Sequence, residues 1–386
     1  MQGINKWQYN FILEVFGLYL SIKGRVNFLQ LARYGKYCEQ RYRGQFERPI
    51  DFLAFNSKLI RQHGSGHYTI AFDPSHISKS GKATPGVGWY WSGCAGKAKW
   101  GLEIGGIGVI DIDNHTGFHL EAVQTPNDLG PHSLVDHYAQ VIIQRKDTLL
   151  PVSPYVVADG YFSKDTFVRP LCENGFDVVS RLRDDADLRY KYQGEQKKGR
   201  GRPRKHNGKV DFSALKREYF AAVTENEGQK VYHAIVYSKA LKRDINLVIE
   251  YNLNKKGEWG HKLYFSTDLQ LPPEQLLKYY RTRFQIEFTF RDAKQFTGLE
   301  HSQARSENKL YSHFNYSLTT VNLAKVTHWL TIPKQEREAF SMADVKTIYH
   351  NNLLLNRFFV MFGIQPDLKK NKHKVTELLY YGARAA

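Results

Sequence analysis

Apolar side chains recur at helical spacing through the first part of the chain. Segments such as FILEVFGLYL and FLQLARYGKY place them three or four positions apart, and no proline occurs before Pro49. This spacing is typical of helices that bury one face. It predicts a helical N-terminal region over residues 1–62.

After this region the apolar pattern becomes that of alternating strands and helices. Strands are predicted over residues 67–73, 100–114, 117–125, 154–159 and 176–183, and helices over residues 133–150 and 163–175. Three strands, a helix, a strand, a helix and a strand describe a mixed α/β core. We assign this first part of the core to residues 63–184.

The following segment interrupts the core with further strands. Residues 185–265 contain four β-type runs, YFAAVT, KVYHAIVYS, INLVIEYNL and HKLYFST, and predict a β-rich insertion. Helical spacing returns after Pro272 and Pro273, so residues 266–332 should carry a long helix and the rest of the core. Residues 333–386 are expected to form a helical C-terminal region that could support dimerisation.

The charge of the chain points to an anionic partner. The net charge is +17 with a pI near 9.5, and 42% of the residues are apolar, enough for a packed core. The three cysteines lack CxxC spacing, which favours a reducing cytosol over disulfides or a zinc ribbon. No segment is long and apolar enough to span a bilayer, so we expect a cytoplasmic protein and no membrane partner.

Part of this charge lies in the N-terminal region. Between residues 23 and 48 it contains Lys23, Arg25, Arg33, Lys36, Arg41, Arg43 and Arg48. A DNA-binding module that lays a helix in the major groove would need such charge. A helical scaffold that touches only phosphates would need it equally, so both interpretations stay open.

Four polar residues in YYRTRFQIEFTFRDAK share a helical stripe. Their successive offsets of 3, 4 and 7 keep them on one side of a single helix, and they are Tyr280, Arg283, Glu287 and Lys294. A phenol, a carboxylate and two cations suit a site that handles phosphate and metal ions. The alternative is a solvated helix face with paired charges.

Two aspartates upstream favour the first interpretation. Asp73 follows the apolar run YTIAF and Asp159 follows YVVA, so both are predicted to close buried strands at one edge of the sheet, where ligands bind. With Glu287 they form a set of three carboxylates. Such a set suits two Mg²⁺ or Mn²⁺ ions about 3.5–4 Å apart, which clamp the oxygens of a phosphoryl transfer. Taken alone, each aspartate is more typical of a turn.

These residues resemble a known family. Tyr280, Arg283, Glu287 and Lys294 match at every spacing the Tyr-x2-Arg-x3-Glu-x6-Lys signature of one group of DDE transposases from bacterial insertion sequences. The contexts FDPSHISKSGK and ADGYFSK also resemble that group, as does a long β-rich insertion before the glutamate. The resemblance covers residues 67–330.

The resemblance implies a ribonuclease H-like catalytic core and cut-and-paste transposition of DNA. Asp73, Asp159 and Glu287 would be the catalytic and metal-binding residues. Water would hydrolyse a strand at the element's end, the exposed 3′-hydroxyl would form a hairpin with the opposite strand, and the reopened end would join target DNA. Tyr280, Arg283 and Lys294 would hold DNA-end phosphates, and the protein would act on terminal repeats as a homodimer.

Two further features could contact DNA. Trp259, in the basic segment KKGEWGHK, could stack on a base flipped near the cleaved end, or could pack on its own sheet. In residues 197–209, seven of thirteen residues are Lys or Arg, which predicts an exposed basic loop. Its Arg200-Gly201-Arg202-Pro203 resembles a minor-groove hook, although phosphate binding by Arg200, Arg202, Arg204 and Lys205 is the more common role of such loops.

Two other functions stay open at this point. One is a catalytically silent DNA-binding protein derived from a transposase. The other is a structure-specific DNA nuclease that uses the same core without joining strands.

Overall fold

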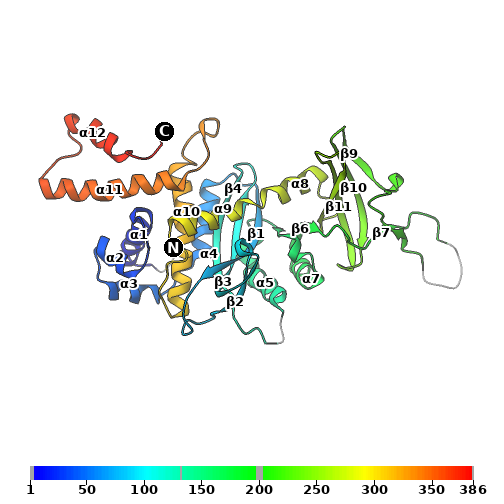
Figure 1. Cartoon of the computed structure of the whole chain (residues 1–386), viewed down its shortest axis with the longest axis horizontal. Coiled ribbons are helices and arrows are strands. Elements are labelled where there is room, and N and C mark those ends of the chain that lie inside the picture. The colour runs from blue at the N-terminus through cyan, green and yellow to red at the C-terminus, as the bar shows by residue number, and fades with distance from the viewer. Residues whose placement is uncertain (1–3, 131–132, 197–202, 385–386) are drawn as a thin grey trace.

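The structure is a computed structural model that describes residues 4–130, 133–196 and 203–384. Helices from both ends of the chain gather at one end of the molecule, the sheet core lies in the middle, and strands β7 to β11 form the other end (Figure 1). The helices are α1 (Lys6–Ser21), α2 (Phe28–Tyr34), α3 (Glu39–Phe46), α4 (Phe52–His63), α5 (Leu134–Ile143), α6 (Lys146–Leu149), α7 (Asp165–Glu173), α8 (Pro273–Thr282), α9 (Gln285–Phe296), α10 (Glu307–His328), α11 (Met342–Phe362) and α12 (Lys369–Leu379). The strands are β1 (Tyr68–Ser78), β2 (Gly88–Ser92), β3 (Lys97–Asp111), β4 (Thr116–Gln124), β5 (Tyr155–Val157), β6 (Asp177–Leu182), β7 (Leu188–Lys191), β8 (His206–Lys209), β9 (Ala221–Glu225), β10 (Gln229–Ser238), β11 (Arg243–Leu253) and β12 (Trp259–Ser266).

The N-terminal region is helical, as the sequence predicts. The side chain of Asn5 accepts a hydrogen bond from the Gln8 backbone and the Gln8 side chain accepts one from Asn5, which satisfies two free donors at the start of α1. Aromatic rings from α1, α3 and α4 surround the Tyr316 ring of α10 at 4.9 to 5.2 Å. This packing fixes the N-terminal helices against the core.

One mixed sheet runs through the middle of the molecule. Its order is β2-β3-β1-β5-β6-β12-β11-β10-β7-β8, with β4 on β3 and β9 on β10. β1, β5 and β6 are parallel to one another, and β12 then pairs antiparallel with β6. The fold is therefore a mixed α/β fold with a large sheet and helices at both ends.

Asparagine side chains form hydrogen bonds with the backbone of the edge strand β4. Asn315 of α10 accepts from the Ala122 backbone at 2.8 Å and donates to its carbonyl at 3.0 Å. Asn322 makes the same pair of bonds with His119, at 2.9 and 2.7 Å. An amide group offers a donor and an acceptor as a neighbouring strand would, so these side chains satisfy the backbone of a buried edge.

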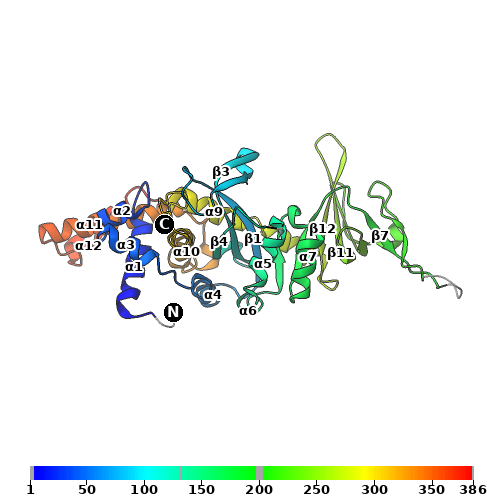
Figure 2. The same cartoon turned by 90° about the horizontal axis from the view of Figure 1, so that it is seen from below.

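Helix α9 lies directly on the strands beside β1, and glycines make this possible. A Cβ added at Gly106 would lie 2.3 Å from the Phe290 ring, and one added at Gly117 would lie 2.6 Å from the backbone oxygen of Gln285. Figure 2 shows α9 beside β3 and β4. The small residues of the sheet thus set the height of α9 above it.

Two local predictions from the sequence are wrong. β1 does not end at Asp73, because β3 pairs with it antiparallel through Pro74 and on to Ser78. The signature does not lie on a single helix, because α8 ends at Thr282 and α9 begins at Gln285. Arg283 keeps helical dihedral angles at this junction. The chain therefore passes from α8 to α9 through a tightened helical turn and does not reverse its direction.

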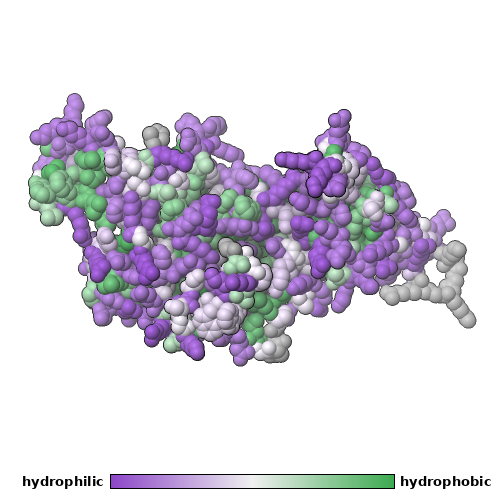
Figure 3. Space-filling view, in the orientation of Figure 1, coloured by the Kyte–Doolittle hydropathy of each residue, from purple (hydrophilic) through white to green (hydrophobic). Residues whose placement is uncertain are grey.

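The C-terminal helices leave much apolar surface exposed. Only the beginning of α11 has buried residues, and α12 has none. Figure 3 shows hydrophobic residues gathered over the end of α11. The large exposed side chains of α11, α12 and the adjoining residues are Leu354, Phe358, Val360, Met361, Phe362, Leu368, Leu378, Tyr380 and Tyr381. Within the described part of the chain, no helix combines the length and apolarity that a membrane span requires.

Candidate active site

Asp73 in β1 and Asp159 just after β5 lie at the same level of the sheet. β1 and β5 are parallel, and Ala71 is opposite Val157. Each aspartate lies two residues further along, and Asp159 keeps an extended backbone with φ −71° and ψ 166°. Because residues two apart in extended chain point to the same side, the two carboxylates lie next to each other.

Glu287 approaches these aspartates from helix α9. Gly106 of β3 is opposite Asp73, and the Phe290 ring lies against Gly106. Glu287 is three residues before Phe290, about one turn of the helix, and therefore projects from the same side of α9. Helix α9 thus carries the third carboxylate to the part of β1 that holds Asp73.

The other signature residues surround this site. Arg283 is largely buried, and its Nη2 lies 3.1 Å from a Glu287 carboxylate oxygen. Its guanidinium lies 6.0 Å from the centre of the Tyr280 ring. Lys294 donates from Nζ to the carbonyl oxygen of His76 at 2.8 Å, which ties α9 to β1 beyond Asp73.

The pKa of Asp73 shows that these charges act on one another. Burial is the largest cause and raises the pKa of Asp73 to about 7. Arg283 and Lys294 lower this pKa, whereas Glu287 and Asp159 raise it. Three carboxylates and two cations therefore share one site, although they are up to 221 positions apart in the sequence (73 to 294).

Two of the three carboxylates are engaged by protein groups in this conformation. Glu287 pairs with Arg283, and the Asp159 carboxylate accepts a hydrogen bond from the Tyr161 backbone. Over the residues that the structure describes, no three His, Cys, Asp or Glu side chains are grouped so as to hold a metal ion. Carboxylates repel one another at close range, and cationic and backbone donors reduce that repulsion.

The structure adds two arginines that the sequence analysis did not single out. A pocket of about 480 Å³ beside Asp159 is lined by Tyr280, Arg181 and Arg183, among other residues. Both arginines come from the end of β6, the parallel neighbour of β5. The available signal was their position at the end of an apolar strand, where a ligand-facing edge is expected.

The remaining candidates lie in or near the β-rich segment. Trp259 begins β12, is 41% exposed, and has the Lys230 ammonium 4.5 Å from its ring centre. Arg204 and Lys205 are exposed, and Arg204 donates to the His206 carbonyl and the Asn207 side chain. The predicted contacts of Arg200 and Arg202 lie outside the described residues.

Comparison with known proteins places the chain in a family. The family model described as "Transposase DDE domain" matches residues 64–323. The chain belongs to the DDE transposase domain family. The match includes both aspartates and the whole signature, so the resemblance predicted from the sequence is confirmed at the level of this family.

No curated protein matches this DDE transposase. Among solved structures it is similar to a chain of the cryo-EM structure of a piggyBac transposase synaptic complex with hairpin DNA. The identity is 10% and the TM-score is 0.40, with 98% of this chain and 77% of that chain covered.

Proposed function

We propose that this DDE transposase cuts and joins DNA by cut-and-paste transposition, with Asp73, Asp159 and Glu287 as its catalytic residues. The observation that carries the proposal is the common level of Asp73 and Asp159 on parallel neighbours β1 and β5, with α9 packed against the strand opposite Asp73. We further propose that the parallel strands belong to a ribonuclease H-like core, and that the chain is in the Tyr-x2-Arg-x3-Glu-x6-Lys group.

The donor set fits hard divalent cations. Asp73, Asp159 and Glu287 offer carboxylate oxygens, the ligands that Mg²⁺ and Mn²⁺ prefer, and burial raises the pKa of Asp73, which a bound cation would lower again. Two such ions would supply charge neutralisation and nucleophile activation for phosphoryl transfer. The protein's own contribution is to hold the three carboxylates and to orient the scissile phosphate.

The cations and the phenol of the signature are suited to that orientation. Arg283 and Lys294 both act electrostatically on Asp73, and Tyr280 lines the Asp159 pocket. A guanidinium, an ammonium and a hydroxyl donate to phosphate oxygens without reading the base sequence. We propose that they hold the phosphates at the DNA end, and that Glu287 is released when a phosphate takes its place beside Arg283.

Replacing Arg283 by alanine should increase the affinity for Mn²⁺ in the absence of DNA. The guanidinium competes with a divalent ion for Glu287, and its Nε has no partner in the described structure. Loss of about 1 kcal/mol of competing ion-pair energy corresponds to roughly fivefold tighter binding. Titration followed by Mn²⁺ electron paramagnetic resonance measures this directly.

The matched control is Arg281→Ala. Arg281 lies in the last turn of α8, two residues before Arg283, but pairs with Glu250 at 2.7 Å, outside the carboxylate site. Its variant should bind Mn²⁺ with the wild-type affinity. Equal Mn²⁺ affinity of Arg283→Ala and wild type would mean that Arg283 does not restrain Glu287.

Other parts of the chain complete the proposal. Residues 1–62 and the basic loop with Arg204 and Lys205 would bind DNA, and Trp259 would stack on a base displaced near the cleaved end, since it is partly exposed beside a cation. Residues 63–184 and 266–332 would form the catalytic core around the insertion 185–265. The exposed apolar side chains of α11 and α12 support a homodimer formed through the C-terminal region.

The reaction products distinguish this function from the two alternatives. The wild-type protein should be incubated with Mg²⁺, a plasmid target and a duplex that carries the inverted repeat flanking the coding sequence. A transposase gives nicked ends, hairpin ends and joined products. Specific binding without any nick would support a catalytically silent protein, and cleavage without joined products would support a nuclease.

A further inference from the structure

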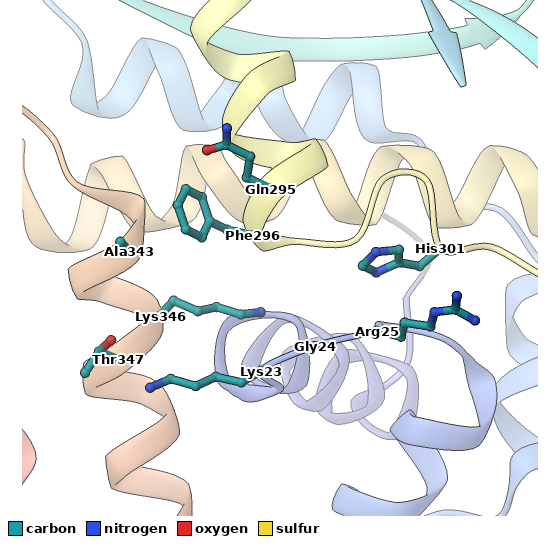
Figure 4. Close-up of a pocket in the computed structure, with 9 residues that line it drawn as sticks. All are labelled: Lys23, Gly24, Arg25, Gln295, Phe296, His301, Ala343, Lys346 and Thr347. Atoms are coloured by element: carbon teal, nitrogen blue, oxygen red, sulfur yellow. The ribbon is translucent and has the colours of Figure 1, made fainter. Parts of the chain in front are cut away.

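Two adjoining pockets form a cleft at the end of helix α9. Each measures about 420 Å³, and both are lined by Arg25 and His301. One extends to Lys23 of the α1–α2 connector and to Lys346 of α11. Figure 4 shows these two side chains on facing walls. The other extends past Lys79, Thr84 and Arg305. We name their union the basic cleft.

The basic cleft has more positive charge than its surroundings neutralise. Lys23, Arg25, Lys79, Arg305 and Lys346 line it. In residues 4–130, 133–196 and 203–384, none of these five cations lies within 4 Å of a carboxylate. The one acidic residue of the lining, Glu300, is 3.9 Å from Lys294. A ligand with negative charge is therefore the natural occupant.

Several contacts hold the walls of the basic cleft in place. The Val26 backbone donates to Nδ1 of His301 at 3.1 Å, which joins the α1–α2 connector to the segment after α9. Lys79 donates to the carbonyl oxygens of Ser302 and Ala304 at 2.7 and 3.1 Å. The cleft is thus a fixed feature of the fold and not a gap between loosely placed loops.

Lys346 is the least exposed of the five cations. Only 5% of its surface is exposed, and its Nζ donates to the carbonyl oxygen of Tyr19 near the end of α1. Burial lowers the pKa of Lys346 to about 7, and burial also lowers the pKa of Lys79. A carbonyl stabilises an ammonium less than an anion does, so both groups would gain from a nearby phosphate.

Helix α9 links the basic cleft to the carboxylate site. Glu287 is in its first turn, and Gln295 near its end lines the cleft. At 1.5 Å per residue, these positions are on the order of 12 Å apart along the helix. For a duplex whose axis runs parallel to α9, each strand rises about 3.4 Å per nucleotide, so this distance corresponds to roughly three to four nucleotides.

We propose that the basic cleft binds the phosphate backbone of transposon-end DNA, about three to four nucleotides from the phosphate at which the strand is cut. The proposal rests on the proposed function and adds a binding site to it. The recognition is of backbone charge, so it places the duplex on the protein without reading its sequence.

The test uses the double variant Lys23→Ala/Arg25→Ala in the full chain. Both side chains are exposed, so the fold should persist, and thermal unfolding followed by circular dichroism verifies this. The matched control is Lys369→Ala/Lys370→Ala, which removes the same charge from exposed positions at the start of α12. Anisotropy of a labelled duplex carrying the flanking inverted repeat gives the affinity at several NaCl concentrations.

Loss of two phosphate contacts should lower the slope of log affinity against log salt by about 1.8, while the control keeps the wild-type slope. Methylphosphonate groups three to four nucleotides from the cut should weaken wild-type binding and leave the Lys23→Ala/Arg25→Ala affinity unchanged. An unchanged slope in that variant would overturn the proposal. A second result would also overturn it: inorganic phosphate stabilises the wild-type protein but not the Lys23→Ala/Arg25→Ala variant, and the DNA affinity of this variant equals that of the wild type.

Repeating the titration with Glu287→Gln separates this proposal from the proposed function. That variant should keep the wild-type slope, because Glu287 lies outside the basic cleft. If the wild-type protein cleaves DNA and Lys23→Ala/Arg25→Ala keeps the wild-type slope, only the proposal for the basic cleft is rejected. A lowered slope in a protein that never cuts DNA would reject only the proposed function.

Discussion

Replacing Glu287 by glutamine should reduce Mg²⁺-dependent DNA cleavage by about three orders of magnitude and leave DNA affinity unchanged. The substitution keeps the size of the side chain but removes the charge that we propose helps to hold the cations. Loss of several kcal/mol of charge stabilisation at the transferring phosphate corresponds to a factor of this size. Single-turnover cleavage of an end-bearing duplex, together with an anisotropy titration, measures both quantities.

Glu274→Gln is the control for this substitution. Glu274 is exposed in the first turn of α8, the helix before α9, so its substitution removes one carboxylate from outside the site. Its variant should cleave at the wild-type rate. Cleavage by Glu287→Gln at the wild-type rate would remove Glu287 from the catalytic set.

Replacing Gly117 by alanine should lower both thermal stability and cleavage. Its added Cβ would lie 2.6 Å from the backbone oxygen of Gln285, the first residue of α9, so the helix must move. The Gly117 carbonyl also accepts from Lys325 and Thr289. Overpacking of this kind costs about 1–3 kcal/mol. A displacement near 1 Å of the helix that carries Glu287 costs on the order of 10²-fold in rate.

Gly260→Ala provides the comparison for Gly117→Ala. Gly260 also lies in a strand, but a Cβ added there meets nothing within 4 Å. Its melting temperature and cleavage rate should match the wild type. A destabilised Gly117→Ala protein that cleaves at the full rate would show that the position of α9 does not control the chemistry.

Sequence reasoning succeeded where a residue pattern has a single physical meaning. The helical spacing of residues 1–62 and the apolar runs before Asp73 and Asp159 predicted the elements that the structure contains. The spacing of the signature also indicated that Arg283 and Glu287 would be close, because residues four apart meet on a helix. These inferences use local geometry only.

The sequence could not predict features that depend on distant partners. Whether β1 stops at Asp73 is decided by β3, which pairs with it as far as Ser78. Asn315 hydrogen-bonds to the backbone of Ala122 because no further strand of the described residues pairs with that edge of β4. Arg25 and Arg305 come together only because the α1–α2 connector packs against the segment after α9. No local pattern encodes these contacts.

The most direct measurement is anomalous diffraction from crystals of the protein bound to end-bearing DNA and Mn²⁺. Our account predicts two Mn²⁺ sites whose protein ligands are the carboxylates of Asp73, Asp159 and Glu287, with Arg283 turned toward a DNA phosphate. Mn²⁺ bound elsewhere, or a Glu287 that still pairs with Arg283 and contacts no metal in the DNA complex, would contradict it.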